Sequence, residues 1–227
     1  MSEPVGKLSV VATPIGNLED ITHRALRVLR ECDYVLCEDT RVTGRLLSAH
    51  DIQAKLTRYD AHSSDAAHTR ILADLAAGQH IALVSDAGTP GISDPGVRLI
   101  EQVRQAGLSI ETIPGPSALT AAISIAGLAG NQFSFLGFVP QKKGRATFFT
   151  ALADYQHPVV FFESTHRITK ALAALAEQYP KRSLTLCREL TKLHEEVLVG
   201  STSEILTALL TTPVKQKGEF ILILHPA

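Results

Sequence analysis

Short apolar runs alternate with longer amphipathic segments along the whole chain, and this alternation constrains the fold more than any other feature. The run at residues 80–84 is almost continuously apolar, as expected of a parallel strand that is covered on both faces. Strands separated by helical segments form βαβ units, so the sequence predicts an α/β fold. The predicted strands are residues 8–12, 34–37, 80–84, 109–113, 133–138, 159–162, 184–187 and 220–224. The predicted helices are residues 22–30, 64–77, 145–153, 169–177 and 204–210, a segment after residue 41, a segment beginning at Pro95 and an alanine-rich segment ending near Ala126.

The segment at residues 127–131 is the best candidate for a linker, because it is rich in glycine and the alternation is less regular beyond it. We therefore expect two α/β domains, at residues 1–127 and 128–227. The first carries the glycine- and proline-rich loops, and the second is expected to close a cleft against it. Within the first domain, Asp94 is expected to cap the helix whose first residue is Pro95.

Charge and cysteine content restrict the function classes. The chain holds 22 Lys and Arg against 23 Asp and Glu, and this balance counts against a generic nucleic-acid binder, which usually has a basic excess. The balance of charge is still compatible with a partner that is recognised by shape.

The three cysteines are not spaced as in a disulfide framework, and neither a secretory signal nor an apolar run of about 20 residues is visible. We therefore expect a soluble, cytoplasmic protein with free thiols and no membrane segment.

Three loops rich in glycine and proline follow predicted strands, at residues 13–17, 85–96 and 114–117. Ligands of open parallel sheets bind outside the carboxyl ends of the strands. Glycine lets a ligand approach the backbone, and proline fixes the shape of a loop before the ligand arrives. One such loop could simply be a turn, but three at strand ends favour a ligand site.

The identity of the ligand is narrowed by motifs that the sequence lacks. It contains no G-x-G, no phosphate-binding P-loop motif, no H-E-x-x-H and no paired C-x-x-C. We therefore predict no metal site. A nucleoside-type ligand, held by backbone groups and short polar side chains, fits the remaining chemistry.

Several motifs, in this order, are similar to those of the ribosomal RNA small subunit methyltransferase I family, a branch of the tetrapyrrole methylases. The similarity extends from Leu8 to Leu224. The motifs occupy residues 13–22, 38–41, 85–96, 114–117, 137–140, 163–167, 188–192 and 217–219. The resemblance implies two α/β domains of the tetrapyrrole-methylase type, with S-adenosyl-L-methionine in the cleft between them, and a homodimer. It also implies 2′-O-methylation of a cytidine ribose in the decoding region of small-subunit (16S) ribosomal RNA.

The resemblance assigns cofactor contacts to the three loops and, less directly, to strand-end positions of the second domain. Asp86 is the sharpest of these candidates, because its carboxylate could accept hydrogen bonds from a ribose or an amino group. The alternative is that Asp86 caps the turn that follows it. Ser117 could cap a helix and still bind the ligand through its backbone. The candidate cofactor residues are Pro14, Ile15, Gly16, Ser85, Asp86, Ala87, Gly88, Thr89, Ser117, Ala118, Phe162, Leu190 and Gly218.

A ribose hydroxyl is a weak nucleophile, and a base beside it would accelerate the reaction by about 10²–10⁴-fold. Candidates at loops that rim the expected cleft are Glu38, Asp39, Glu163, Glu189 and Lys192, with Arg41 beside the first two. Our hypothesis is that Lys192 or Glu189 assists proton removal. Lys192 would need a lowered pKa to act in its neutral form. The alternative is that pairs such as Glu163–Arg167 and Glu189–Arg188 are structural ion pairs.

RNA contacts are expected from the basic loop at residues 141–145 and from five arginines near the edge of the first domain. These arginines are Arg24, Arg27, Arg30, Arg41 and Arg45. The expected partner is ribosomal RNA within the assembled small subunit. Two alternatives stay open at this point: a tetrapyrrole C-methyltransferase, and a non-catalytic RNA-binding or ribosome-assembly factor that keeps the fold as a scaffold.

Overall fold

The computed structural model describes residues 6–92, 96–128 and 130–226. These residues form two compact units, the first ending at Ser117 and the second beginning at Ala118. The sequence predicted the boundary after residue 127, which would leave the alanine-rich helix α5 (Ala118–Ile125) in the first domain. The contacts of the chain instead group α5 with the second unit. Among the described residues, no helix is both long and apolar enough to cross a lipid bilayer.

The first unit is a five-stranded, wholly parallel sheet with the strand order β3-β2-β4-β1-β5. The strands are β1 (Lys7–Val11), β2 (Tyr34–Cys37), β3 (Leu56–Arg58), β4 (His80–Leu83) and β5 (Ser109–Ile113). The helices are α1 (His23–Glu31), α2 (Thr40–Ala49), α3 (Asp65–Ala76) and α4 (Val97–Gln105), with a short 3₁₀ helix η1 (Leu18–Asp20). The prediction of βαβ units is confirmed here.

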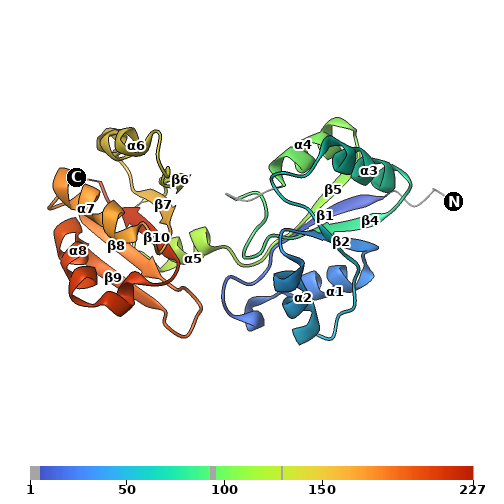
Figure 1. Cartoon of the computed structure of the whole chain (residues 1–227), viewed down its shortest axis with the longest axis horizontal. Coiled ribbons are helices and arrows are strands. Elements are labelled where there is room, and N and C mark those ends of the chain that lie inside the picture. The colour runs from blue at the N-terminus through green and yellow to red at the C-terminus, as the bar shows by residue number, and fades with distance from the viewer. Residues whose placement is uncertain (1–5, 93–95, 129, 227) are drawn as a thin grey trace. The chain divides into compact units, whose positions relative to one another are not determined.

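Strands β1, β2, β4 and β5 of this sheet place side chains in two separate apolar cores, one on each face. Val11 of β1 packs with residues of α1 and α2 on one face. Leu8 of the same strand packs with residues of α3 and α4 on the other face. Figure 1 shows α1 and α2 on one side of the sheet and α3 and α4 on the opposite side. Both faces are therefore covered, which explains the continuous apolar character of the central strands.

Two neighbouring strands, β1 and β4, send the chain to opposite faces of the sheet. After β1 the chain continues into α1, and after β4 it continues into α4. Loops that diverge in this way open a crevice at the carboxyl ends of the strands, and ligands of open α/β sheets bind there. The topology thus makes the loops after β1 and β4 the natural ligand site of this unit.

Side-chain caps fix the start of most helices in this unit. Thr22, Asp39 and Ser64 accept hydrogen bonds from backbone N–H groups in the first turns of α1, α2 and α3. Helix α4 is described from Val97, with Gly96 at its N-cap and no side-chain cap. The predicted start of this helix at Asp94 and Pro95 lies outside the described residues.

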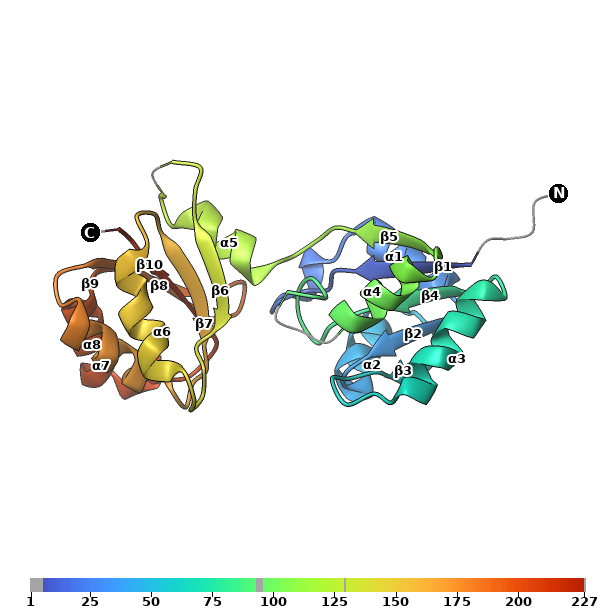
Figure 2. The ribbon, with the colours of Figure 1, turned by 90° about the horizontal axis from the view of Figure 1, so that it is seen from above.

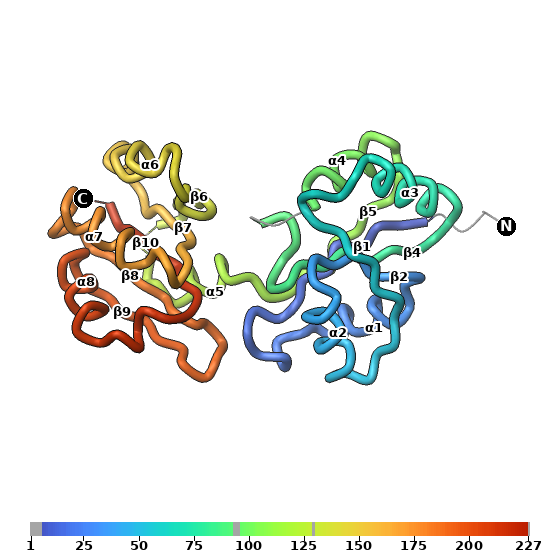
Figure 3. The backbone as a smooth tube through the Cα atoms, viewed as in Figure 1, coloured from blue at the N-terminus to red at the C-terminus, as the bar shows by residue number. Residues whose placement is uncertain are grey.

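The second unit has a mixed sheet with the strand order β6-β7-β10-β8-β9. Its strands are β6 (Ser134–Phe138), β7 (Val159–Glu163), β8 (Ser183–Arg188), β9 (Glu196–Ser201) and β10 (Phe220–Leu224). Strands β6, β7 and β8 run in one direction and β9 and β10 in the other, because β7 and β8 both pair antiparallel with β10 and β8 pairs antiparallel with β9. The expectation of parallel βαβ units is therefore wrong for the step from β8 to β9. The reason is local: β8 and β9 are joined by a short loop at residues 189–195, too short for a crossover helix. The backbone can be followed through these connections in Figure 3.

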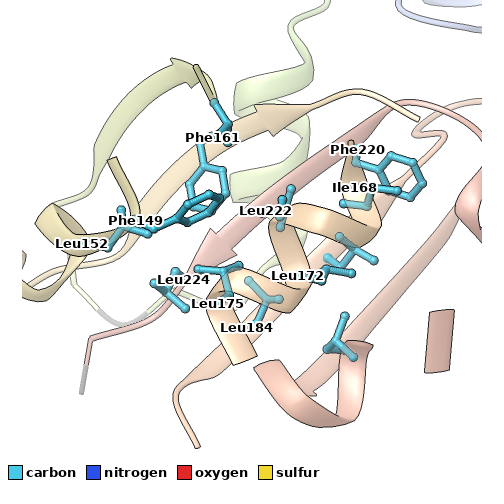
Figure 4. Packing of buried hydrophobic residues seen from close by; sticks show 14 of the residues in the cluster. Phe149, Leu152, Phe161, Ile168, Leu172, Leu175, Leu184, Phe220, Leu222 and Leu224 are labelled. Carbon is cyan, nitrogen blue, oxygen red and sulfur yellow. The ribbon is translucent and has the colours of Figure 1, made fainter. Parts of the chain in front are cut away.

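One face of the second sheet carries the largest core of this unit. The helices α6 (Arg145–Ala151), α7 (Ile168–Gln178) and α8 (Thr202–Thr211) lie along this face (Figure 2), accompanied by the 3₁₀ helices η2 (Leu152–Asp154) and η3 (Pro213–Gln216). Phe149, Phe161 and Leu172 are among the residues that fill the space between the helices and the sheet (Figure 4). Ser201 and Glu204 form a capping box that starts α8.

Two strands, β3 and β9, had no counterpart in the predicted elements. Strand β3 has only three residues, two of them polar, and is held by its pairing with β2. Strand β9 lies at the edge of its sheet, and Val199 is exposed. Neither segment has an apolar run long enough to be recognised without its partner strand.

Candidate functional site

The three glycine- and proline-rich loops meet at the carboxyl edge of the first sheet, because they follow the neighbouring strands β4, β1 and β5. The loops after β1 and β4 are joined by an isolated two-residue bridge. The Thr13 N–H donates to the Gly88 carbonyl at 2.9 Å, and the Gly88 N–H donates to the Thr13 carbonyl at 3.0 Å. The buried Thr13 hydroxyl also donates to the Ser85 carbonyl at 3.2 Å. The sequence placed these loops at one site, but it assigned no role to Thr13.

The third loop is attached to the second by a side chain. The Thr89 hydroxyl donates to the Pro116 carbonyl at 3.0 Å. The backbone of Ala12 donates to the Ile113 carbonyl at 3.1 Å, which continues the pairing of β1 and β5 beyond the strand ends. The loops are therefore hydrogen-bonded to one another, and the site is preformed within this unit.

Two glycines are required by the close approach of these loops. Gly88 has a φ of +83°, and a Cβ at this position would lie 3.3 Å from Ile15 Cγ2. A Cβ on Gly115 would lie 3.1 Å from the Ala12 Cβ. Larger residues would push the loops apart or strain the backbone. The close approach of the loops therefore depends on these two glycines.

Asp86 lies exposed in the loop after β4, and its Oδ1 accepts a hydrogen bond from the Asp39 N–H at 3.1 Å. Asp39 belongs to the loop after β2, so Asp86 connects two loops that are distant in sequence. The structural role considered for Asp86 from the sequence was a cap of the turn that follows it. In the structure, its side chain instead contacts the backbone of another loop.

Asp39 and Arg41 form a tight pair at the start of α2. The Arg41 Nε and Nη2 groups contact the Asp39 carboxylate at 3.0 Å and 2.6 Å, and the Arg41 N–H donates to it at 2.8 Å. The side-chain hydrogen bond from Arg41 is the main reason that the pKa of Asp39 is held far below its usual range. Asp39 is therefore ionised and a weak base. Glu38, the other acidic candidate in this loop, is half-buried at the end of β2.

The remaining predicted cofactor residues of this unit lie in the three loops. Pro14, Ile15 and Ser85 are buried, whereas Gly16 and Ala87 are exposed. Ser117 is half-buried where the first unit ends, and Ala118 is the first residue of α5 in the second unit. No group of three or more His, Cys, Asp or Glu side chains suited to a metal ion is found among the described residues.

The second-unit candidates gather at one edge of their own sheet. Phe220 of β10 pairs with Glu163 of β7 and with Arg188 of β8, so the ends of β7 and β8 and the start of β10 lie together. Phe162 is half-buried and packs edge-on against Phe135, with ring centroids 5.0 Å apart. The other two candidates, Leu190 and Gly218, lie in the loops at this edge; Leu190 is buried.

Lys192 and Glu189, the two residues of the proton-transfer hypothesis, contact each other in the loop after β8. The Lys192 ammonium lies 3.1 Å from Glu189 Oε1 and 3.1 Å from Glu219 Oε2. Burial acts to lower the pKa of Lys192, but its hydrogen bonds and charge interactions with Glu219 and Glu189 outweigh this, and the pKa is raised. Lys192 is therefore a charged ammonium, and the neutral amine that the hypothesis needs is not favoured.

Glu163 at the end of β7 forms a buried ion-pair network. Its carboxylate accepts from Arg145 Nη1 at 2.9 Å, from Arg167 Nε at 2.7 Å and from the Ser164 N–H at 2.8 Å. The predicted ion pair of Glu163 and Arg167 is thus present, and it lies within the second unit. For Glu189 the partner differs from the expected one, because Arg188 donates to backbone carbonyls, including that of Lys217 at 2.7 Å.

The basic loop at residues 141–145 is only partly available to a nucleic acid. Lys142 and Lys143 are exposed. Arg145, in contrast, points to Glu163 and to the Pro140 carbonyl at 3.2 Å. The Arg145 guanidinium neutralises a buried carboxylate, so its contact with phosphates stays a prediction and Lys142 and Lys143 are the exposed cations of this loop.

Comparison with known proteins places the chain among methyltransferases. It is 48% identical over 223 residues to the ribosomal RNA small subunit methyltransferase I of Neisseria meningitidis, covering 98% of this chain and 77% of that protein. It is 43% identical over 203 residues to the protein of the same name from Thermotoga maritima, covering 89% of this chain and 91% of that protein. The chain belongs to the ribosomal RNA small subunit methyltransferase I family.

Residues 7–206 also match the family model for tetrapyrrole (corrin/porphyrin) methylases. Several solved structures share the fold, among them the following two. Diphthine synthase superposes with a TM-score of 0.74 at 15% identity, covering 97% of this chain and 90% of that one. The uroporphyrin-III-C-methyltransferase of Thermus thermophilus superposes with a TM-score of 0.66 at 21% identity, covering 97% of this chain and 94% of that one. The two-domain α/β fold and the methyltransferase class of this family member are thus established, in a family that generally uses S-adenosylmethionine.

Proposed function

We propose that the chain transfers the methyl group of S-adenosyl-L-methionine to the 2′-hydroxyl of a cytidine in the decoding region of small-subunit ribosomal RNA. The observation that carries the proposal is the junction of three hydrogen-bonded, glycine- and proline-rich loops at the switch point of the first sheet, in a chain of this family. The names of the relatives support the substrate. We further propose that the enzyme works in the cytoplasm as a homodimer on assembled small ribosomal subunits.

The chemistry of the first-unit loops fits the proposed cofactor. Gly88 and Gly115 allow the loops to approach one another closely, which brings main-chain groups together at one edge of the sheet, where they can contact a nucleoside. Asp86 supplies an ionisable carboxylate beside them, able to accept from a ribose hydroxyl or an amino group. In the bound state the cofactor would supply a methyl group that its sulfonium already activates. The residues that we propose to hold it are Pro14, Ile15, Gly16, Ser85, Asp86, Ala87, Gly88, Thr89, Ser117 and Ala118.

Three residues of the second unit remain predicted cofactor contacts: Phe162, Leu190 and Gly218.

The main task of the protein is to align the ribose oxygen with the methyl group, and such orientation can contribute about 7–11 kcal/mol to lowering a barrier. The environment of Lys192 keeps its ammonium protonated, and the Asp39 carboxylate is paired with Arg41. Glu38, half-buried at the end of β2, stays a predicted acceptor of the hydroxyl proton.

RNA binding is proposed to rest on a small number of exposed cations. Lys142 and Lys143 extend from the basic loop, and the chain as a whole carries a net charge of −1. Because the chain has no excess of positive charge, recognition of a shaped, assembled particle is favoured over binding of free RNA by phosphate contacts alone. Exchanging both lysines for glutamine should weaken substrate binding and flatten its dependence on salt.

The deciding experiment supplies the protein with labelled S-adenosylmethionine and small ribosomal subunits that lack the modification, followed by nucleoside analysis. Label in 2′-O-methylcytidine is the expected result. Asp86→Asn should reduce cofactor affinity by on the order of tenfold, since a charged hydrogen-bond partner is lost. Asp154→Asn, at an exposed aspartate of η2, is the matched control. Label in another nucleoside, or in an added tetrapyrrole but not in RNA, would refute the proposal.

A further inference from the structure

Glu189 takes up both backbone hydrogen-bonding groups of Glu219, in the segment that leads into β10. The Glu189 N–H donates to the Glu219 carbonyl at 3.0 Å. In return, Glu189 Oε1 accepts from the Glu219 N–H at 2.9 Å and from the Lys192 ammonium at 3.1 Å. The side chain therefore lies across the peptide that joins Gly218 to Glu219.

Gly218 is held from both sides. A Cβ at this position would lie 2.5 Å from Glu189 Cγ, and its φ is +117°. On the other side, the Thr165 hydroxyl accepts from the Gly218 N–H at 2.9 Å and donates to the Gly218 carbonyl at 2.5 Å. Three loops, which follow β7 and β8 and precede β10, are thereby joined around one glycine.

The loop that carries Glu189 has a strained backbone. Glu189 has a φ of +52°, and two residues later Thr191 has a φ of +66°. A β-branched residue such as Thr191 rarely adopts a positive φ, so its backbone conformation is a genuine outlier. Such strain persists only where surrounding contacts impose it, and it is concentrated at functional sites. The strain therefore indicates that this loop has a function beyond connecting β8 to β9.

We propose that Glu189 is a positioning residue, which holds the Gly218–Glu219 backbone in place for methyl transfer and does not itself accept the substrate proton. The proposal rests on the function proposed above. Burial alone would raise the pKa of Glu189, but hydrogen bonds from the Glu219 backbone and Lys192 outweigh it, and the pKa is lowered. A carboxylate with a lowered pKa is a weaker base, which agrees with the positioning role.

The test compares Glu189→Gln with Glu189→Ala, because glutamine keeps an oxygen that can accept from the Glu219 N–H but cannot take up a proton near neutral pH. Hydrogen exchange of the Glu219 amide measures the contact directly, without any activity. Single-turnover methyl transfer to small ribosomal subunits, followed across pH, measures its consequence. Glu177→Ala, at an exposed glutamate of α7, is the matched control.

We expect Glu189→Gln to keep the wild-type pH profile and a rate within about threefold of the wild type. Glu189→Ala should lose on the order of tenfold in rate, with Glu219 exchange accelerated by a similar factor. The proposal is overturned if glutamine is as slow as alanine and the pH profile loses a limb, or if the exchange of Glu219 is the same in all variants. Should Glu189→Ala not fold, Thr165→Val tests the same assembly, with faster Gly218 exchange supporting it and unchanged exchange overturning it.

Failure of the proposed function would be distinguishable from failure of this inference. If the wild-type protein transfers no methyl group to the subunits, the substrate is wrong. The exchange of the Glu219 amide in Glu189→Ala would still decide whether Glu189 holds this segment.

Discussion

Removal of the Glu163 carboxylate should destabilise the second unit strongly. The side chain is fully buried at the end of β7, where it accepts hydrogen bonds from two guanidinium groups and one backbone N–H. Each charge-assisted hydrogen bond contributes about 1.5–3 kcal/mol, and their loss is partly offset because Arg145 and Arg167 can regain water. We therefore expect Glu163→Ala to lower the free energy of unfolding by about 3–5 kcal/mol, the usual result of breaking one side of a buried ion pair.

Native-state hydrogen exchange at the amides of β7 and β10 is the appropriate assay, because it reports on this unit without requiring the whole chain to unfold in one step. Asp65→Ala provides a control at an exposed ion pair with Arg98 in the first unit, where exchange at the amides of β4 should report a change of about 1 kcal/mol or less. Added salt should alter the control more than the Glu163 variant, since buried charges are screened less. A loss of under about 1 kcal/mol for Glu163→Ala would refute the view that the network anchors β7.

Three further predictions concern backbone space, pH and thiol reactivity. Gly218→Ala should destabilise the second unit by about 1–3 kcal/mol and accelerate exchange of nearby amides, because the new Cβ meets the Glu189 side chain at 2.5 Å. The pKa of His80 is lowered from 6.5, first by burial and then by the charge of Lys7. The first unit should therefore become less stable as the pH falls below 6.5, since the unfolded state then binds more protons. In urea titrations, His80→Gln should remove this part of the pH dependence of stability. Cys187, fully buried with its pKa raised to about 11 by burial, should resist alkylation at pH 8 until the protein unfolds.

Each of these predictions has a contrary outcome, and the first also has a matched control. Gly107→Ala is the control for Gly218, because no atom lies within 4 Å of a Cβ at Gly107 although its φ is also positive. Equal effects at the two glycines would mean that backbone strain alone matters. An unaltered pH dependence in His80→Gln would assign it to other groups, such as Glu111. Rapid alkylation of Cys187 in the folded protein would show that the second unit opens readily.

The sequence alone determined most of the first unit. Its central strands are buried on both faces, so their apolar runs are continuous, and glycine and proline mark the loops at their carboxyl ends. Those local signals were enough to identify the three loops and the candidates around Asp86. The same reasoning was weaker in the second unit, where β9 is an edge strand and its exposed valines are diluted by polar neighbours.

Only the tertiary structure decided which charged residues are paired with which. Arg145 looked like a surface cation in the sequence, yet its guanidinium neutralises Glu163, 18 residues away. Glu189 looked like a base, yet its carboxylate is engaged by the backbone of Glu219, 30 residues away. Sequence patterns record burial through periodicity, but ion pairs and side-chain contacts to the backbone depend on which loops the sheet brings together. For this protein the local pattern determined where the loops are, and the packing of the strands determined what their charged side chains can do.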